Sequence, residues 1–248
     1  YCFVIYPLKR NNDMKKLLLS LTMLAIISTP VLAKSPVANL KINGDIKPPT
    51  CTINGATQSD VIFDYGVISP TLIPQSKIYS YPASMVQNTV TVECDAKTYL
   101  TFVASDTYDN TELSVNNTSD WFHLVDKANP ETAVGAAYFV WDNVTVDGKP
   151  AYISRANDAA ITGTNYYNVL YKGPTNGWTS KQQTESVDKG SLALISGEIF
   201  QANFRQGIES NPTQTFILSR DELSKKGIDL SNGLDFIGEA VLTFNFGV

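Results

Sequence analysis

Apolar residues recur at every second position along most of this 248-residue chain, and this pattern constrains the fold more than any other feature of the sequence. Alternation of this kind predicts β-strands with one buried face and one exposed face. The alternating runs cover residues 61–65, 90–94, 100–102, 136–146, 150–154, 165–171, 191–205, 213–219 and 239–248. Turn-forming residues separate the runs, and the dipeptide Asp147-Gly148 is typical of a two-residue hairpin. The sequence therefore predicts an all-β sandwich of many short strands.

One segment, residues 219–227, has the pattern of a helix. Two acidic residues, Asp221 and Glu222, come early and two lysines come late, as the helix dipole favours, and Gly227 is placed as a C-cap. We expect one short helix in an otherwise β fold.

Residues 14–33, MKKLLLSLTMLAIISTPVLA, have the features of a secretory signal peptide: two lysines, a short apolar core and small residues before the expected cleavage point after Ala33. The apolar core is shorter than the ~20 residues that a membrane-spanning helix needs, and no later segment is long and apolar enough to anchor the chain. We expect residues 1–13 to be upstream sequence foreign to the protein. The mature protein is then a single domain, residues 34–248, with an elaborated middle.

The charge of this mature chain argues against two classes of partner. Residues 1–33 hold four of the 19 basic residues and one of the 24 acidic residues, so 15 basic and 23 acidic residues remain and the net charge changes from −5 to −8. Such a surface repels nucleic acid and anionic lipid. We expect no nucleic-acid partner and no membrane span after cleavage of the signal peptide.

Two cysteines, Cys51 and Cys94, remain when Cys2 is set aside with the leader. An even pair in an exported protein predicts a disulfide. The alternative is a metal site with two thiolate ligands, but the chain offers only one histidine, His123, as a further nitrogen ligand. We predict a disulfide, and neither a metal nor a cofactor.

Both ends of the predicted mature chain carry a family resemblance. After the signal peptide, Leu40, Ile42, Gly44, Ile46 and Cys51 follow the pattern apolar-x-apolar-x-Gly-x-apolar and then a cysteine. This pattern resembles the first strand of fimbrial subunits built by the chaperone–usher route. The strand that ends at Cys94, the segment FDYGVI (63–68) and the alternating C-terminal residues 238–248 are similar to later strands of the same family. The middle of the chain, about 105 to 235, carries no motif of the family.

The resemblance implies an immunoglobulin-like, pilin-type sandwich that lacks one strand and is completed by a donor strand. Its partners would be a periplasmic chaperone, an usher and neighbouring fimbrial subunits. The protein would pass through the periplasm to a cell-surface fimbrium that supports adhesion. The residues expected along the open groove are Leu40, Ile42, Ile46, Leu242, Phe244 and Phe246. The alternative is a complete sandwich closed by its own last strand, which would make the chain a self-sufficient periplasmic protein.

One departure from the family concerns the donor segment. Polymerising subunits carry an extension before the first strand, but residues 34–39 offer only six positions, with Val37 as the single large apolar residue. Either the subunit accepts a strand without donating one, or LKINGDI (40–46) itself is donated. The short extension favours an acceptor-only or minor subunit.

Enzyme and ligand functions have weaker support in the sequence. The single histidine, His123, has no partner serine in a Gly-x-Ser-x-Gly motif, and we expect no enzyme. Aromatic residues alternate with amides and acids in residues 121–123, 138–143 and 165–178, a composition that could bind a host glycan. Tyr166, Tyr167 and Trp178 are the candidates for that role. The favoured interpretation is that these aromatic residues face the core of a sandwich.

Overall fold

The computed structural model describes residues 36–82, 86–115, 118–163, 166–183, 187–206 and 215–247. The predicted signal peptide, residues 14–33, lies outside these ranges. The chain divides into two units at Asp45 and Ile46, and the second unit holds every strand and helix described below. No helix in the described residues is long and apolar enough to cross a membrane.

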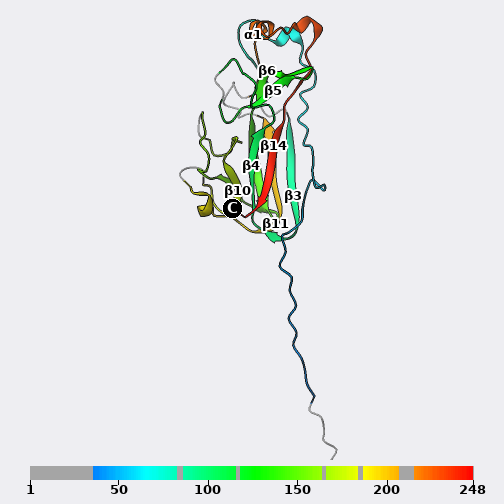
Figure 1. Ribbon diagram of the computed structural model, residues 1–248, viewed down its shortest axis with the longest axis vertical. Helices are drawn as coiled ribbons and strands as arrows, with labels where there is room; N and C mark the ends of the chain where they lie inside the picture. The colour runs from blue at the N-terminus through cyan, green and yellow to red at the C-terminus, as the bar shows by residue number, and fades with distance from the viewer. Residues whose placement is uncertain are drawn as a thin grey trace, which may run out of the picture. The chain divides into compact units, whose positions relative to one another are not determined.

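The prediction of an all-β sandwich with one short helix is confirmed. Strands form three antiparallel sheets (Figure 1). The first sheet has the order β1 (Cys51–Ile53), β3 (Gln87–Thr98), β11 (Gly197–Gln206), β7 (Phe139–Val146) and β8 (Lys149–Pro150). The second has the order β14 (Ala240–Phe246), β4 (Leu100–Asp106), β10 (Thr175–Thr179) and β9 (Tyr152–Arg155). The third has the order β13 (Phe236–Ile237), β5 (Phe122–Asp126), β6 (Asn129–Ala137), β12 (Phe216–Ile217) and β2 (Tyr79–Ser80).

The first two sheets share one hydrophobic core. Val92 and Phe200 come from the first sheet, and Phe102 and Trp178 come from the second. The Trp178 ring lies 5.5 Å from the ring of Phe102 and 5.6 Å from that of Phe200. Because aromatic side chains bury large areas, these contacts hold the two layers together.

The third sheet packs against the helix around a second core. Phe216 and Leu218 contribute to it, together with Leu223 of the helix α1 (Arg220–Lys225). The helix begins where the sequence predicts, because the Ser219 hydroxyl accepts a hydrogen bond from the backbone N–H of Glu222 and caps its first turn. Single turns of 3-10 helix occur at η1 (Pro70–Leu72), η2 (Lys189–Ser191) and η3 (Leu230–Asn232).

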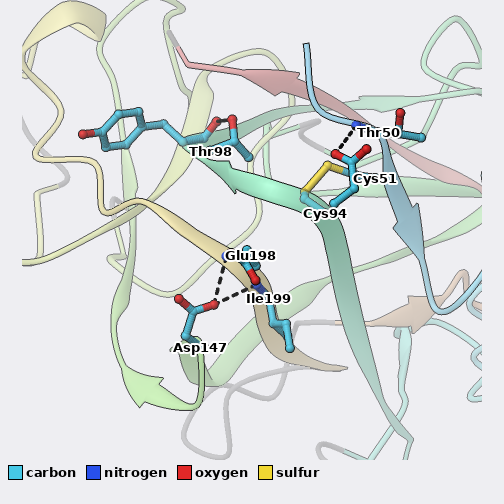
Figure 2. The surroundings of a disulfide bond; sticks show 9 residues. Thr50, Cys51, Cys94, Thr98, Asp147, Glu198 and Ile199 are labelled. Carbon is cyan, nitrogen blue, oxygen red and sulfur yellow. Dashed lines mark hydrogen bonds between the residues drawn. A yellow bond between two sulfur atoms is a disulfide. The ribbon is translucent and has the colours of Figure 1, made fainter. Parts of the chain in front are cut away.

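The hairpin between β7 and β8 also follows the sequence. Asp147 and Gly148 have φ angles of 49° and 71°, as the predicted turn requires. The Asp147 carboxylate accepts hydrogen bonds of 2.9 Å from the backbone N–H groups of both Glu198 and Ile199 (Figure 2). Both bonds lower the pKa of Asp147, and the bond from Ile199 has the larger effect. The turn is thereby attached to the start of β11.

Three predicted strands need correction. Residues 40–46 and 61–65 have no regular secondary structure. Residues 166–171 contain a single isolated bridge, between Val169 and Val140, and residue 165 lies outside the described residues. Residues 61–65 still alternate in burial, but side chains attach them: the Asn88 amide donates to the carbonyl of Ile62, and the Tyr81 hydroxyl donates to that of Tyr65. The alternation therefore predicts which side chains are covered without predicting a paired backbone.

Candidate strand-accepting groove

The strand β14 lies at the edge of its sheet. It pairs with β4 along its whole length (Figure 1). No other described strand pairs with its second edge. Backbone bonds join Thr107 to Glu239 and Gly247 to Tyr99, so the odd-numbered residues of this segment exchange hydrogen bonds with β4. The even-numbered residues of β14 then direct their N–H and C=O groups toward the open edge. An unpaired edge of this kind can receive another strand.

A groove of about 950 Å³ runs along β14. One wall is β14 with β13, and the other is the irregular segment 57–65. Among the described residues, no backbone hydrogen bond joins residues 57–68 to another segment. Both walls thus present backbone groups that a strand between them could use.

Apolar side chains from both layers of the sandwich reach the groove. The apolar side chains that come from strands other than β14 include Val90, Val92, Leu100, Phe122, Phe139 and Phe204. Ala240, Leu242 and Phe244 of β14 are only half-buried, although they pack on the main core. The Phe244 ring lies 5.7 Å from that of Phe102, whereas Phe246 at the end of the strand is 48% exposed. The core is therefore incompletely covered along this edge.

Leu242, Phe244 and Phe246, three of the residues predicted for the groove, line this one. Leu40, Ile42 and Ile46, the other residues predicted for the groove, are 97%, 98% and 103% exposed. The wall opposite β14 is formed by residues 57–65. Sequence reasoning missed this wall because the alternation of residues 61–65 suggested an ordinary paired strand.

The predicted disulfide between Cys51 and Cys94 is confirmed. The two cysteines lie opposite each other in the antiparallel pair of β1 and β3, and the bond spans 43 positions in sequence (Figure 2). The backbone N–H of Thr50 donates to the Asp95 carboxylate at 2.9 Å, and the N–H of Asp95 donates to the Thr50 carbonyl at 3.0 Å. Cys51 also lines the groove, so the disulfide fixes one end of it.

The three candidate glycan-binding residues are not brought together at a surface. Trp178 is 1% exposed and its indole N–H donates to the Gln201 carbonyl, so its ring is part of the core and cannot stack on a sugar. Tyr166 is half-buried, and its backbone N–H donates to the Tyr171 hydroxyl. Tyr167 is 61% exposed. The role proposed for Trp178 is corrected, because alternate aromatic residues of these strands face inward.

A separate polar cavity of about 500 Å³ lies beside the end of β4. Asp106 and Asp109 line it together with Lys172, whose ammonium contacts the Asp109 carboxylate. The ring of His123 is fully buried nearby, and its Nδ1 lies 2.9 Å from the Tyr108 carbonyl. Possible metal-ligand atoms of the two aspartates and this histidine lie within 4.8 Å of one another. We assign no metal to them, because the Lys172 ammonium already supplies a positive charge to both carboxylates.

No protein-family model matches the chain, and no curated protein is significantly similar to it.

Proposed function

We propose that the protein is a structural subunit of a bacterial surface fimbria, assembled by donor-strand exchange after export to the periplasm. The observation that carries the proposal is the unpaired edge of β14 beside an apolar groove. The resemblance of both ends of the chain to chaperone–usher subunits supports the same conclusion. A periplasmic chaperone would fill the groove first, and a neighbouring subunit would replace it at the usher.

The energetics of the groove favour such an exchange. An added strand would pair with the free backbone groups of β14 and place alternate side chains among half-buried residues such as Leu242 and Phe244. Each large apolar side chain that becomes buried contributes roughly 1.5–3 kcal/mol. Covering the edge also removes a surface that would otherwise pair with unrelated chains. A subunit with this groove is therefore most stable when it is held by a partner.

The segment LKINGDI (40–46) is the donor that we propose within this chain. Leu40, Ile42 and Ile46 share one face of an extended strand, Gly44 stands on the same face, and the three large side chains are exposed. This exposure favours donation by the segment over the acceptor-only subunit expected from the short extension. The groove of a neighbouring copy would then receive three apolar side chains at alternate positions.

A peptide of residues 36–47 tests the proposal with the full chain as acceptor. At a peptide concentration 100 times Kd, binding to the folded state alone stabilises it by about 2.7 kcal/mol. For a domain of this size that corresponds to a rise in Tm of roughly 5–10 °C. The control peptide has serine in place of Leu40, Ile42 and Ile46, and we expect it to leave Tm unchanged. Equal effects of the two peptides would contradict donation by this segment, and failure of every alternating apolar peptide to bind would contradict the groove itself.

A further inference from the structure

Three charged side chains converge at the end of β4 in the polar cavity. The Lys172 ammonium contacts the Asp109 carboxylate and lies 3.9 Å from Oδ2 of Asp106. The side chain of Asp106 is 0% exposed, that of Lys172 is 13% exposed and that of Asp109 is 54% exposed. A lysine with most of its length buried therefore ends between a fully buried carboxyl group and one that reaches solvent.

The backbone holds the lysine and the buried carboxyl group in fixed positions. Lys172 forms a parallel bridge with Ala104, and its N–H donates to the Ser119 carbonyl at 2.8 Å. The two oxygens of Asp106 accept hydrogen bonds from the backbone N–H groups of Tyr108, at 2.9 Å, and His123, at 2.8 Å. The backbone of Lys172 is therefore fixed beside β4, and the Asp106 side chain cannot turn away without breaking its two hydrogen bonds.

We propose that Lys172 and Asp106 join in an intramolecular amide, an isopeptide bond between Nζ and Cγ. This site is independent of the groove and of the proposed function. The Asp109 carboxylate acts as the base, and Asp106 in its neutral form is the electrophile.

The step balances without any further reactant. Asp109 takes one proton from the Lys172 ammonium, and the free amine attacks Cγ of the neutral Asp106 carboxyl group. The N–H groups of Tyr108 and His123 point at the oxygens on which negative charge develops. The hydroxyl of Asp106 leaves as water with a second proton from Nζ, and Asp109 returns the first proton to solvent through its exposed side.

Two features of the site favour this reaction. Burial raises the pKa of Asp106, against the lowering effect of the two backbone hydrogen bonds and of the electrostatic interactions with His123 and Lys172. It so favours the neutral carboxyl group that an amine can attack. The fold also places the amine beside the carboxyl group, so the two groups need not meet by diffusion. Well-oriented groups within one molecule react as if one of them were present at about 10⁵–10⁸ M. The burial of Asp106 then keeps water from the amide that forms.

The bond would reinforce the sandwich beside the groove. It would tie the end of β4, which carries β14, to the segment that leads into β10. The link closes the chain between positions 106 and 172 and does not overlap the loop closed by Cys51 and Cys94.

Intact mass spectrometry of the purified full chain tests the inference directly. We expect the wild-type protein, after reduction of the disulfide, to be lighter than its sequence by the mass of one water molecule. Lys172→Arg keeps the positive charge but cannot form the amide, so it should have the full mass calculated from its sequence. Both proteins share the same N-terminus, so the comparison does not depend on where the N-terminus is processed. Lys149→Arg, at an exposed lysine of β8, is the matched control and should retain the loss of water.

Fragmentation of a tryptic digest locates the bond. We expect one branched peptide that joins Lys172 to Asp106, and its disappearance in Asp106→Ala. Asp109→Asn removes the base and should increase the fraction of uncross-linked protein. A wild-type protein of full mass would overturn the proposal, and a bond to Asp109 instead of Asp106 would overturn the roles assigned to the two carboxyl groups.

Discussion

Replacing Leu242 by alanine should weaken strand binding far more than it destabilises the isolated subunit. Leu242 lies on β14, is half-buried, and packs on the main core from the edge of the groove. Removing a fully buried leucine costs about 2–5 kcal/mol. Because the groove leaves this side chain partly uncovered, we expect a loss of about 1–2 kcal/mol in the free protein.

The difference between the two states gives the effect on binding. An inserted strand would cover Leu242, so the cost of the substitution would approach that of a buried leucine in the complex. We therefore expect binding to weaken by about 1–3 kcal/mol, which is a rise in Kd of roughly 5- to 150-fold. Asn245→Ala is the control, because Asn245 lies on the opposite face of β14, is exposed and does not line the groove, and its effect should stay within about 0.5 kcal/mol.

Titration of labelled peptide 36–47 into each full-chain variant measures these values by fluorescence anisotropy, and urea unfolding gives the stability of the free proteins. An equal loss of affinity in Asn245→Ala and Leu242→Ala would refute the reasoning. An unchanged affinity in Leu242→Ala would refute it as well, because the strand would then bind somewhere other than the groove.

Three further predictions concern the fold. Reduction of the bond between Cys51 and Cys94 should lower the free energy of unfolding by about 4 kcal/mol, measured in urea with and without reductant; a change below about 1 kcal/mol would show that this loop stays constrained without the disulfide. Asp147→Asn keeps an amino acid that tolerates a positive φ but loses the charged acceptor, so the variant should be less stable by about 1 kcal/mol at pH 7. Since the pKa of Asp147 is lowered from 3.8, the stabilisation is present above pH 4 and is lost as the pH falls through the folded value; a deficit that persists at pH 2 would contradict this origin. Ser219→Ala should cost about 1 kcal/mol by removing the cap on Glu222, while Ser219→Asp should preserve stability, and equal stability of the alanine and aspartate variants would exclude a capping role.

Prediction from sequence succeeded where a local pattern decides the structure. Acidic residues early, lysines late and Gly227 after them indicated α1, and Asp147-Gly148 indicated a hairpin. Alternation found β3, β4 and β14, because one face of each packs on the main core. It missed β10, which contains Gly177. A side chain at Gly177 would come within 2.6 Å of Leu194, so close packing explains a glycine inside this strand.

The candidate sites depend more on tertiary contacts than the strands do. The C-terminal side of the groove was predictable from the alternation of β14, but the opposite wall is an extended segment with no paired backbone. Asp106 and Lys172 are far apart in sequence and meet through the bridge between Ala104 and Lys172. No local pattern in either segment indicates that meeting, because sequence periodicity carries no information on which segments become neighbours.

Amide hydrogen exchange along β14, followed residue by residue by NMR in the full chain, tests most directly whether the sandwich is open at this edge. The amides of Val241, Thr243 and Asn245 face β4, whereas those of Leu242 and Phe244 face the groove. We predict slow exchange for the first set and fast exchange for the second, and slow exchange for both once a donor strand is bound. Equally slow exchange of both sets in the free protein would show that the edge is already covered, and would contradict strand completion as the basis of the protein's function.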